Sequence, residues 1–251
     1  MEVINEKVTR PPRGIIYGME KVGKSTFCAE FPNPIFLPIK GEEGVDEIGV
    51  SRFKVSDSLE EVTERMKELC TEEHEYSTLV FDSLSSLEPL IHDFICRKYG
   101  QESIGDFKFS EGYRKANEQF YKLLNICDYL RNEKYMTIIF IGHTKIDSIN
   151  DPTGDSYNTY NIDCNKYINA TIQRWADFIF FARFKTLTKS TDSGRSQSKT
   201  KAFKQDRILS CSSNGSFTAG GRDIYGNLPL DIELSYSVFQ DELKKAGGKN
   251  D

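Results

Sequence analysis

Near its N-terminus the chain reads Gly18-Met19-Glu20-Lys21-Val22-Gly23-Lys24-Ser25-Thr26. The first eight residues fit G-x-x-x-x-G-K-[ST], the phosphate-binding P-loop. An apolar run at 14–17 can form a buried strand before the loop, and 25–31 can form a helix after it. Glycines let the backbone curl around a phosphate, and the helix N-terminus presents free N–H groups to it. We therefore expect all nine residues to bind ATP, with Lys24 reaching the β- and γ-phosphates.

Strands and helices alternate along the rest of the chain. Apolar runs at 34–39, 52–55, 78–82, 137–141 and 177–182 are typical of strands, and helical patterns cover 59–69, 89–99, 110–131 and 164–175. This alternation predicts an α/β fold with a mostly parallel sheet and helices on both faces. The polar stretches 99–109 and 142–162 are expected to be loops. Short strands or a hairpin are expected near 207–211 and 232–234.

The domain organisation predicted from composition is simple. We expect an N-terminal arm at 1–13, an ATPase domain at 14–235 and a C-terminal tail at 236–251, with a mobile Ser/Thr/Gly/Lys-rich segment at about 190–200. No apolar run approaches the roughly 18 residues of a membrane span, and the N-terminus lacks a signal-peptide pattern. We therefore expect a cytoplasmic protein with no membrane partner. The six cysteines are scattered without a C-x-x-C pair, which argues against structural zinc and a disulfide framework.

Charge is distributed unevenly. The net charge is −5, yet residues 42–75 hold twelve acids against four bases while residues 183–207 hold eight bases against two acids. A basic segment of this kind could bind a polyanion or the acidic patch of a neighbouring copy. The alternative is that both segments are ordinary solvated surfaces. A homo-oligomer is therefore one expectation for this chain.

Several polar residues follow apolar strands, at the sheet edge where ligands bind in α/β proteins. Asp82 closes the run 79–81 and is expected to hold Mg²⁺ together with the Ser25 hydroxyl. Glu42, after the 34–39 strand, is our candidate for the carboxylate that activates the attacking water, with Glu43 as the alternative. His143 follows the 137–141 strand and is expected to sense the γ-phosphate.

The stretch from 143 to 174 combines cations with rings, as single-stranded nucleic acid binding requires. The candidate DNA-binding residues are Lys145, Tyr157, Tyr160, Lys166 and Arg174, with Tyr167 nearby. The same composition suits a subunit interface. A cation from a neighbouring copy can stabilise charge on the γ-phosphate. Arg222 is our main candidate for it, and Lys201, Lys204 and Arg207 are the others.

The set formed by 18–25, 42–44, 78–82 and 138–143 resembles the RecA-like P-loop ATPases. More narrowly, it is similar to the compact phage ATPases of the group that includes single-strand annealing proteins related to RecA and archaeal RadB. The resemblance covers about residues 10–235. It implies that a glutamate after the second strand activates water, and that DNA lies along loops near 99–112 and 143–165. The segment 219–229 is similar to a family tail in which a basic residue precedes a Gly-x-Leu-Pro turn, which favours Arg222.

From these residues we expect an Mg²⁺-dependent, DNA-stimulated ATPase that acts on single-stranded DNA in phage-type recombination or replication, within a bacterial host cell if phage-encoded. Two alternatives remain. One is a nucleotide-gated assembly factor for a replication or recombination protein. The other is a P-loop kinase of small molecules, against which the absence of an arginine-rich lid in the sequence counts.

Overall fold

The computed structural model describes residues 3, 5–6, 8–42, 44–149, 155–185 and 206–247. The strands are β1 (Arg13–Gly18), β2 (Pro34–Pro38), β3 (Ser51–Arg52), β4 (Thr78–Asp82), β5 (Thr137–Gly142), β6 (Thr144–Ile149), β7 (Tyr157–Ile162), β8 (Phe178–Phe184), β9 (Arg207–Ser210), β10 (Gly220–Gly221) and β11 (Asp231–Glu233). The helices are α1 (Lys24–Ala29), α2 (Leu59–Thr71), α3 (Leu84–Tyr99), α4 (Glu111–Glu133), α5 (Lys166–Trp175) and α6 (Tyr236–Gly247). Short 3₁₀ turns are η1 (Ile104–Asp106), η2 (Lys108–Ser110) and η3 (Asp223–Asn227).

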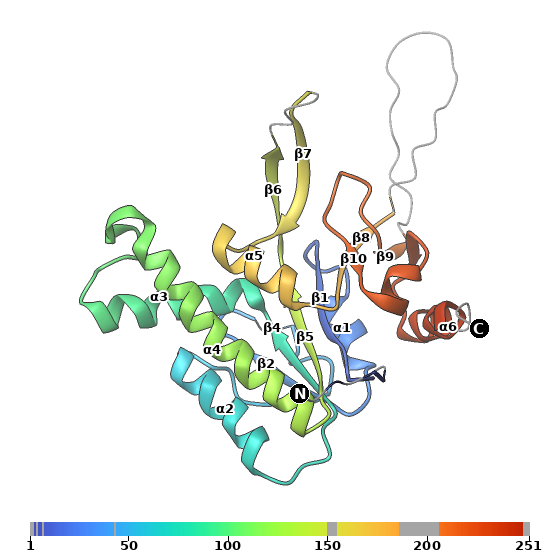
Figure 1. The fold of residues 1–251 in the computed structure, drawn as a ribbon, viewed down its shortest axis with the longest axis horizontal. Coiled ribbons are helices and arrows are strands. Elements are labelled where there is room, and N and C mark those ends of the chain that lie inside the picture. Colours follow the sequence, from blue (N-terminus) through green and yellow to red (C-terminus); the bar gives the residue numbers. More distant parts are fainter. Residues whose placement is uncertain are drawn as a thin grey trace.

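One sheet organises the molecule (Figure 1). Its strands run in the order β11-β9-β8-β1-β5-β4-β2-β3, and β10 also pairs with β8. The strands from β8 to β3 pair in parallel, whereas β9, β10 and β11 add antiparallel pairs at the other edge. The predicted mostly parallel α/β sheet is therefore confirmed. Parallel pairing places the C-terminal ends of β1, β2, β4 and β5 at one edge, where the P-loop and the candidate carboxylates follow.

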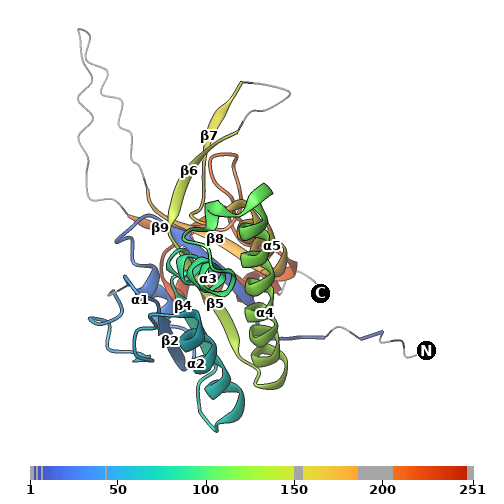
Figure 2. The same cartoon turned by 90° about the vertical axis from the view of Figure 1, so that its left-hand side faces the viewer.

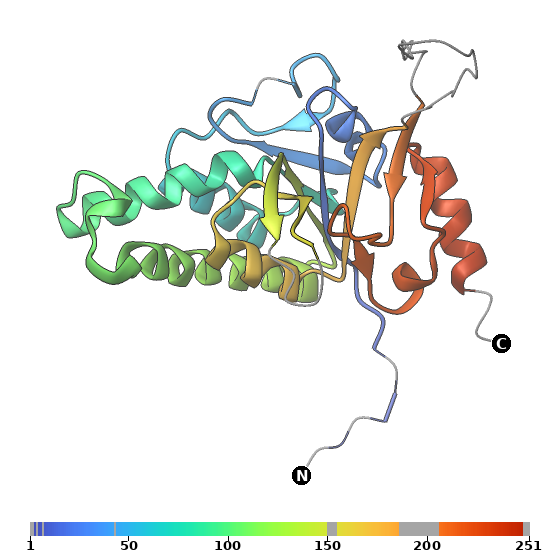
Figure 3. The same cartoon turned by 90° about the horizontal axis from the view of Figure 1, so that it is seen from above.

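Helices cover both faces, as Figure 3 shows for the green α3–α4 pair and the red α6. On one face, α2, α3, α4 and α5 pack on the sheet through a core that includes Met66, Ile91, Phe120 and Ile172. On the other, α1 and α6 pack through a second core that includes Phe27 and Phe239. Alternate residues of the central strands serve the two cores, so these strands are apolar throughout, as expected for a sheet buried on both sides.

The expectation of a loop at 142–162 is wrong for its described residues. β6 and β7 form an antiparallel hairpin, with Thr144 opposite Ile162 and Ile149 opposite Tyr157, that projects beyond the sheet (Figures 1 and 2). Because most of the hairpin lies outside the core, with Thr159 and Ile162 as its buried residues, its sequence shows no clear apolar alternation, the usual signal of a strand. At its base, the Tyr160 N–H donates to Ser216 O at 2.8 Å, which ties β7 to the segment before β10.

The range expected to be a C-terminal tail contains helix α6, and this helix is part of the domain. Phe239 is only 3% exposed, and its ring centroid lies 5.9 Å from those of both Phe27 and Phe180. Tyr236 packs on Phe31 with centroids 4.6 Å apart. The helical spacing of Tyr236, Phe239, Leu243 and Ala246 is a signal for this helix that the sequence analysis overlooked.

Candidate nucleotide site

The P-loop connects β1 to α1 through two glycines in conformations that disfavour side chains. Gly18 has φ +155°, and a Cβ on it would lie 1.9 Å from Ala182 O of the neighbouring strand. Gly23 has φ +103° and directly precedes the first residue of α1. These constraints explain why glycine stands at both positions. The loop therefore turns tightly and ends with the N–H groups of α1 free for a phosphate.

Lys24 lies inside this loop. Its Nζ donates to Gly18 O at 3.0 Å and to Met19 O at 2.8 Å, and the residue is 7% exposed. Burial lowers the pKa of Lys24, while the nearby Asp82 and Glu42 carboxylates oppose this effect. The ammonium group of Lys24 is thus held by carbonyl groups of the loop, and phosphate oxygens could replace these carbonyls as its hydrogen-bond acceptors.

Ser25 and Asp82 meet at the end of β4. The Ser25 hydroxyl donates to Asp82 Oδ2 at 2.8 Å. Asp82 is 3% exposed, and burial raises its pKa to about 6, helped by repulsion from Glu42 and opposed by the Ser25 hydrogen bond and Lys24. A buried carboxylate with a raised pKa is one that a divalent cation would stabilise in its ionised form.

These oxygen donors fit Mg²⁺, which prefers hydroxyl, carboxylate and phosphate oxygens and keeps several waters. Among the residues that the structure describes, no three of His, Cys, Asp and Glu gather into a metal cage. A cation here would accordingly rely on Ser25, Asp82 and the nucleotide. Sequence analysis named both residues, and the structure brings them together.

Glu42 and His143 form the third part of the site. Glu42 Oε1 accepts from Ser83 Oγ at 2.6 Å and from Ser86 Oγ at 2.7 Å, and lies 2.8 Å from His143 Nε2. Burial alone would raise the pKa of Glu42, but these hydrogen bonds, led by that of His143, lower it to about 2. The same contact with Glu42 raises the pKa of His143. Glu42 is therefore an ionised carboxylate across a wide pH range.

One cavity of about 980 Å³ joins these groups. It is lined by Lys24, Ser25, Glu42, Asp82 and His143, and also by residues that we did not assign to it, among them Ser86, Glu47 and Arg207. The proposed catalytic and metal-binding residues therefore share one compartment with the P-loop. Ser83 and Ser86 were missed by sequence reasoning, although a run of serines directly after Asp82 was a visible signal.

Tyr17 was also missed. This buried tyrosine directly precedes Gly18, and its hydroxyl donates to Thr218 O at 2.6 Å and accepts from Thr218 N at 3.0 Å. Burial raises the pKa of Tyr17 above its usual range. Because Thr218 N also approaches Tyr160 O at 3.3 Å, the residue that opens the P-loop is connected to the hairpin base through Thr218.

The candidate DNA-binding residues lie on two elements, with Lys145, Tyr157 and Tyr160 on the β6–β7 hairpin and Lys166 and Arg174 on α5. Lys145 points inward, with its Nζ donating to Cys164 O at 2.7 Å, and Tyr160 stacks on Phe181 with centroids 5.4 Å apart. Tyr157 on the hairpin and Lys166 at the start of α5 are exposed. Arg174 is exposed at the far end of α5, where its carbonyl accepts from Arg222.

Arg222 lies at the opposite edge of the sheet from the P-loop of its own chain. Its Nη1 is 3.9 Å from Asp177 Oδ1, in a network where Asp177 also binds Arg13 and Arg131. A role for Arg222 at a neighbouring copy's site stays a prediction. Glu43, Lys201, Lys204 and the segment 190–200 lie outside the described residues. Over the described part of the chain, no helix is long and apolar enough to cross a membrane.

Comparisons with known proteins identify the family of this chain. A search of curated proteins finds no match. Among solved structures, a crystal structure of the RadB recombinase is similar, with 12% identity over 80% of each chain and a TM-score of 0.45. The family model described as "AAA domain" matches residues 10–222, which include the P-loop, Asp82 and His143. The P-loop strand at the centre of a mostly parallel sheet makes the fold RecA-like. The chain therefore belongs to the AAA domain family of P-loop proteins, and it is a RecA-like member of that family.

Proposed function

We propose that this protein binds Mg²⁺ and ATP and hydrolyses the γ-phosphate bond while acting on single-stranded DNA, in recombination or replication of the phage type. The observation that carries the hydrolytic part is the ionised Glu42 carboxylate in the P-loop cavity. ATP hydrolysis depends mainly on positioning and on electrostatic stabilisation, because the protein does little covalent chemistry.

Glu42 acts in this proposal as the group that orients the attacking water. Its Oε1 is occupied by Ser83, Ser86 and His143, so Oε2 is the oxygen left to accept a hydrogen bond from water. A carboxylate with a pKa of about 2 is a weak proton acceptor, so its main contribution is orientation and polarisation. The three donors hold the carboxylate in one position, as water-directed catalysis requires.

The remaining groups bind the nucleotide. Lys24 exchanges its two loop carbonyls for phosphate oxygens, and the N–H groups at the start of α1 surround the phosphates. Bound Mg²⁺ supplies charge neutralisation on the phosphates. Ser25 and Asp82 are the residues that would hold it. His143 connects the site to the hairpin, because it is the one residue between β5 and β6 and because it touches Glu42.

The DNA part of the proposal rests on the hairpin and the start of α5. Tyr157 is 40% exposed and can stack on a base, and Lys166 is an exposed cation beside the hairpin base. We also propose that copies assemble along the DNA, as the charge asymmetry between 42–75 and 183–207 suggests.

A specific observation favours the assembly factor as a second candidate function. The hairpin exposes Ile146 at 62% and Ile149 at 38%, and on and beside it the acids Asp147, Asp155 and Asp163 outnumber the bases Lys145 and Lys166. Exposed apolar side chains among acids suit a protein partner better than a phosphate backbone. In this case ATP binding would gate the docking of a replication or recombination protein on the hairpin.

The deciding experiment is ATP turnover, without an added phosphate acceptor, in the presence and absence of single-stranded DNA. Lys24→Ala is the inactive variant, and Lys40→Ala is the matched control, because Lys40 is exposed and pairs only weakly with Asp57 at 3.8 Å. DNA stimulation that is lost in Lys24→Ala and weakens steeply with salt supports the DNA-acting ATPase. Turnover indifferent to DNA moves support to the assembly factor, and turnover that needs a small-molecule acceptor moves it to the kinase.

A further inference from the structure

Arg207, the first residue of β9, lies over the P-loop of its own chain. It lines the same cavity as Lys24 and Ser25. A Cβ on Gly23 would lie 2.7 Å from Arg207 Nη1 and 3.8 Å from Leu234 Cδ2. The guanidinium therefore covers the glycine directly before α1, and glycine at position 23 leaves room for it.

The backbone of Arg207 is fixed by strands on both sides. β9 pairs with β8, where Arg207 lies opposite Phe184, and Arg207 O accepts from Leu234 N at 3.0 Å. The side chain is thus anchored on the sheet rather than on a separate loop. Sites built on strands hold side chains in place better than sites built on loops.

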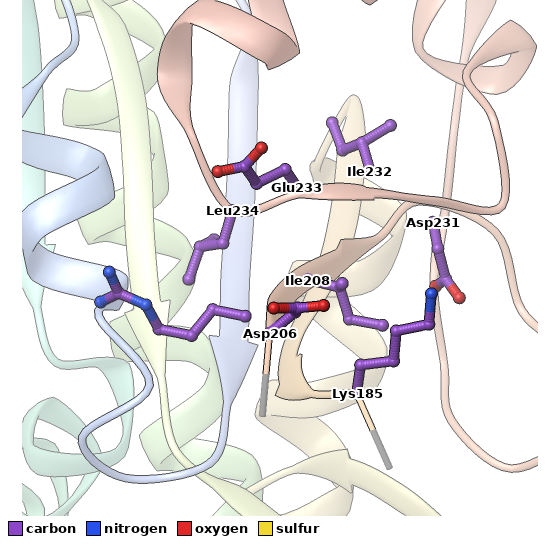
Figure 4. A pocket seen from close by; sticks show the side chains of 8 residues that line it. Lys185, Asp206, Ile208, Asp231, Ile232, Glu233 and Leu234 are labelled. Atoms are coloured by element: carbon purple, nitrogen blue, oxygen red, sulfur yellow. The ribbon is translucent and has the colours of Figure 1, made fainter. Parts of the chain in front are cut away.

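The guanidinium itself has no acidic partner within the part of the chain that the structure describes. No hydrogen bond or ion pair joins its nitrogens to a described residue, although arginines elsewhere are paired, such as Arg183 with Asp231 at 3.0 Å. Arg207 also lines a second cavity of about 620 Å³, whose other lining residues include Asp206, Asp231 and Glu233 (Figure 4). Arg207 therefore lies between the P-loop cavity and a second cavity that is lined by acidic residues.

We propose that Arg207 binds the phosphates of the nucleotide held by its own chain. An unpaired guanidinium above a loop that accepts phosphate is placed to donate charge-assisted hydrogen bonds, and arginine matches phosphate geometry. Together with Lys24 it supplies a second positive charge from within the chain. This inference rests on the proposed nucleotide binding, and it replaces our expectation that Arg207 could serve a neighbouring copy.

Binding of a fluorescent ATP analogue tests the proposal directly. We expect Arg207→Ala and Arg207→Gln to weaken binding about 10- to 100-fold, with Arg207→Lys between them and the wild type. Lys185→Ala is the matched control, because Lys185 is a cation of the second cavity that does not line the P-loop cavity. Wild-type affinity in both Arg207→Ala and Arg207→Gln overturns the proposal, and so does an equal loss in Lys185→Ala.

A mixing experiment separates action within a chain from action between chains. Lys24→Ala chains carry an intact Arg207, and Arg207→Ala chains carry an intact P-loop. If Arg207 acts within its own chain, mixing the two restores neither ATP binding nor turnover. Recovery to a sizeable fraction of wild-type turnover means that Arg207 acts on a neighbour, and contradicts the proposal.

The same variants distinguish this inference from the proposed function. If Lys24→Ala binds ATP as well as the wild type, nucleotide binding at the P-loop itself is wrong. If Lys24→Ala loses binding while Arg207→Ala keeps it, the site stands and only the role of Arg207 is wrong. Thermal unfolding of each variant serves as the folding check, and the exposed position of Arg207 predicts little change in it.

Discussion

Glu42 Oε1 lies 2.8 Å from His143 Nε2, although 101 residues separate the two in the chain. The contact joins the loop after β2 to the residue that directly follows β5, and these two strands flank β4 in the sheet. It couples the charges of a carboxylate and an imidazole inside the nucleotide cavity. Any event that moves one of the two side chains changes the protonation of the other.

The first prediction concerns pH. Contact with Glu42 raises the pKa of His143 in the folded protein above its ordinary value of 6.5. Protonated His143 therefore stabilises the fold fully below about pH 6.5, and this stabilisation is lost as pH rises through the raised pKa. Because His143 is partly exposed, we expect about 1 kcal/mol or less. Urea unfolding at pH 5.5 and 8.5 should show a smaller difference in His143→Gln than in the wild type. His74→Gln, outside the site, is the control, and an unchanged difference in His143→Gln contradicts the prediction.

The second prediction separates hydrolysis from binding. Glu42→Gln removes the charge that orients water but keeps a hydrogen-bonding oxygen, so turnover should fall about 100-fold or more while ATP affinity changes little. Single-turnover hydrolysis and fluorescent-nucleotide binding measure the two effects. Glu47→Gln is the matched control, because Glu47 lines the same cavity but is an exposed residue. Loss of turnover in Glu43→Gln with full activity in Glu42→Gln would instead assign the role to the alternative residue.

The third prediction concerns the cost in stability of burying the Asp82 carboxylate. Burial raises the pKa of Asp82 to about 6 from an ordinary value of 3.8. The folded protein thus holds this proton more tightly than the unfolded chain, so its stability falls as pH rises from about 4 to about 6 and stays lower above that range. Asp82→Asn removes this cost. At pH 8 without Mg²⁺, we expect Asp82→Asn to raise the free energy of unfolding by up to about 3 kcal/mol, so that the variant unfolds at a higher denaturant concentration than the wild type.

The same variant should lose the dependence of ATP binding on Mg²⁺, because one of the two protein ligands is gone. In the wild type, Mg²⁺-dependent affinity should rise between pH 5 and pH 7 as Asp82 ionises. Titrations at these two pH values are the measurement. A destabilised Asp82→Asn protein at pH 8, or one with unchanged Mg²⁺ dependence, would count against a buried carboxylate in this role.

Much of the site could be predicted from the sequence, for a physical reason. Asp82 ends a buried parallel strand, and the P-loop, Glu42 and His143 come after such strands, whose ends meet at one sheet edge. At these positions, the residue type and its place at a strand end were therefore enough to predict that the side chains lie close together. Prediction was weaker where contacts depend on distant elements, as for Ser83 and Ser86, whose role appears only once Glu42 is placed against them.

The hairpin and Arg207 show the limits more clearly. The β6–β7 strands pair with each other and not with the main sheet, and of their residues Thr159 and Ile162 are buried, so no continuous apolar face marks the strands in the sequence. Arg207 is part of a basic segment, and its sequence alone does not tell whether it serves its own site or a neighbour's. In the structure, the antiparallel pairing of β9 with β8 places Arg207 next to Gly23 of its own chain.

The fourth prediction concerns the opposite edge of the sheet. Asp177 accepts from Arg13 at 3.0 Å and from Arg131 at 3.2 Å, and these ion pairs lower its pKa despite burial. Asp177→Asn leaves two partly buried guanidinium groups without their main partner, which should cost about 2–4 kcal/mol of folding free energy. Asp57→Asn is the control, because its pair with Lys40 is exposed and worth well under 1 kcal/mol. Equal denaturation midpoints for the two variants would rule out a structural role for this network.

Helix α6 gives α1 its hydrophobic support. α1 is only six residues long and is too short to be stable by itself, so its position depends on what Phe27 packs against. Phe239 and Tyr236 supply that surface from near the end of the described chain. Helix α6 therefore supports the position of α1, and we expect a truncation before residue 236 to weaken nucleotide binding, although it removes no residue that lines the P-loop cavity.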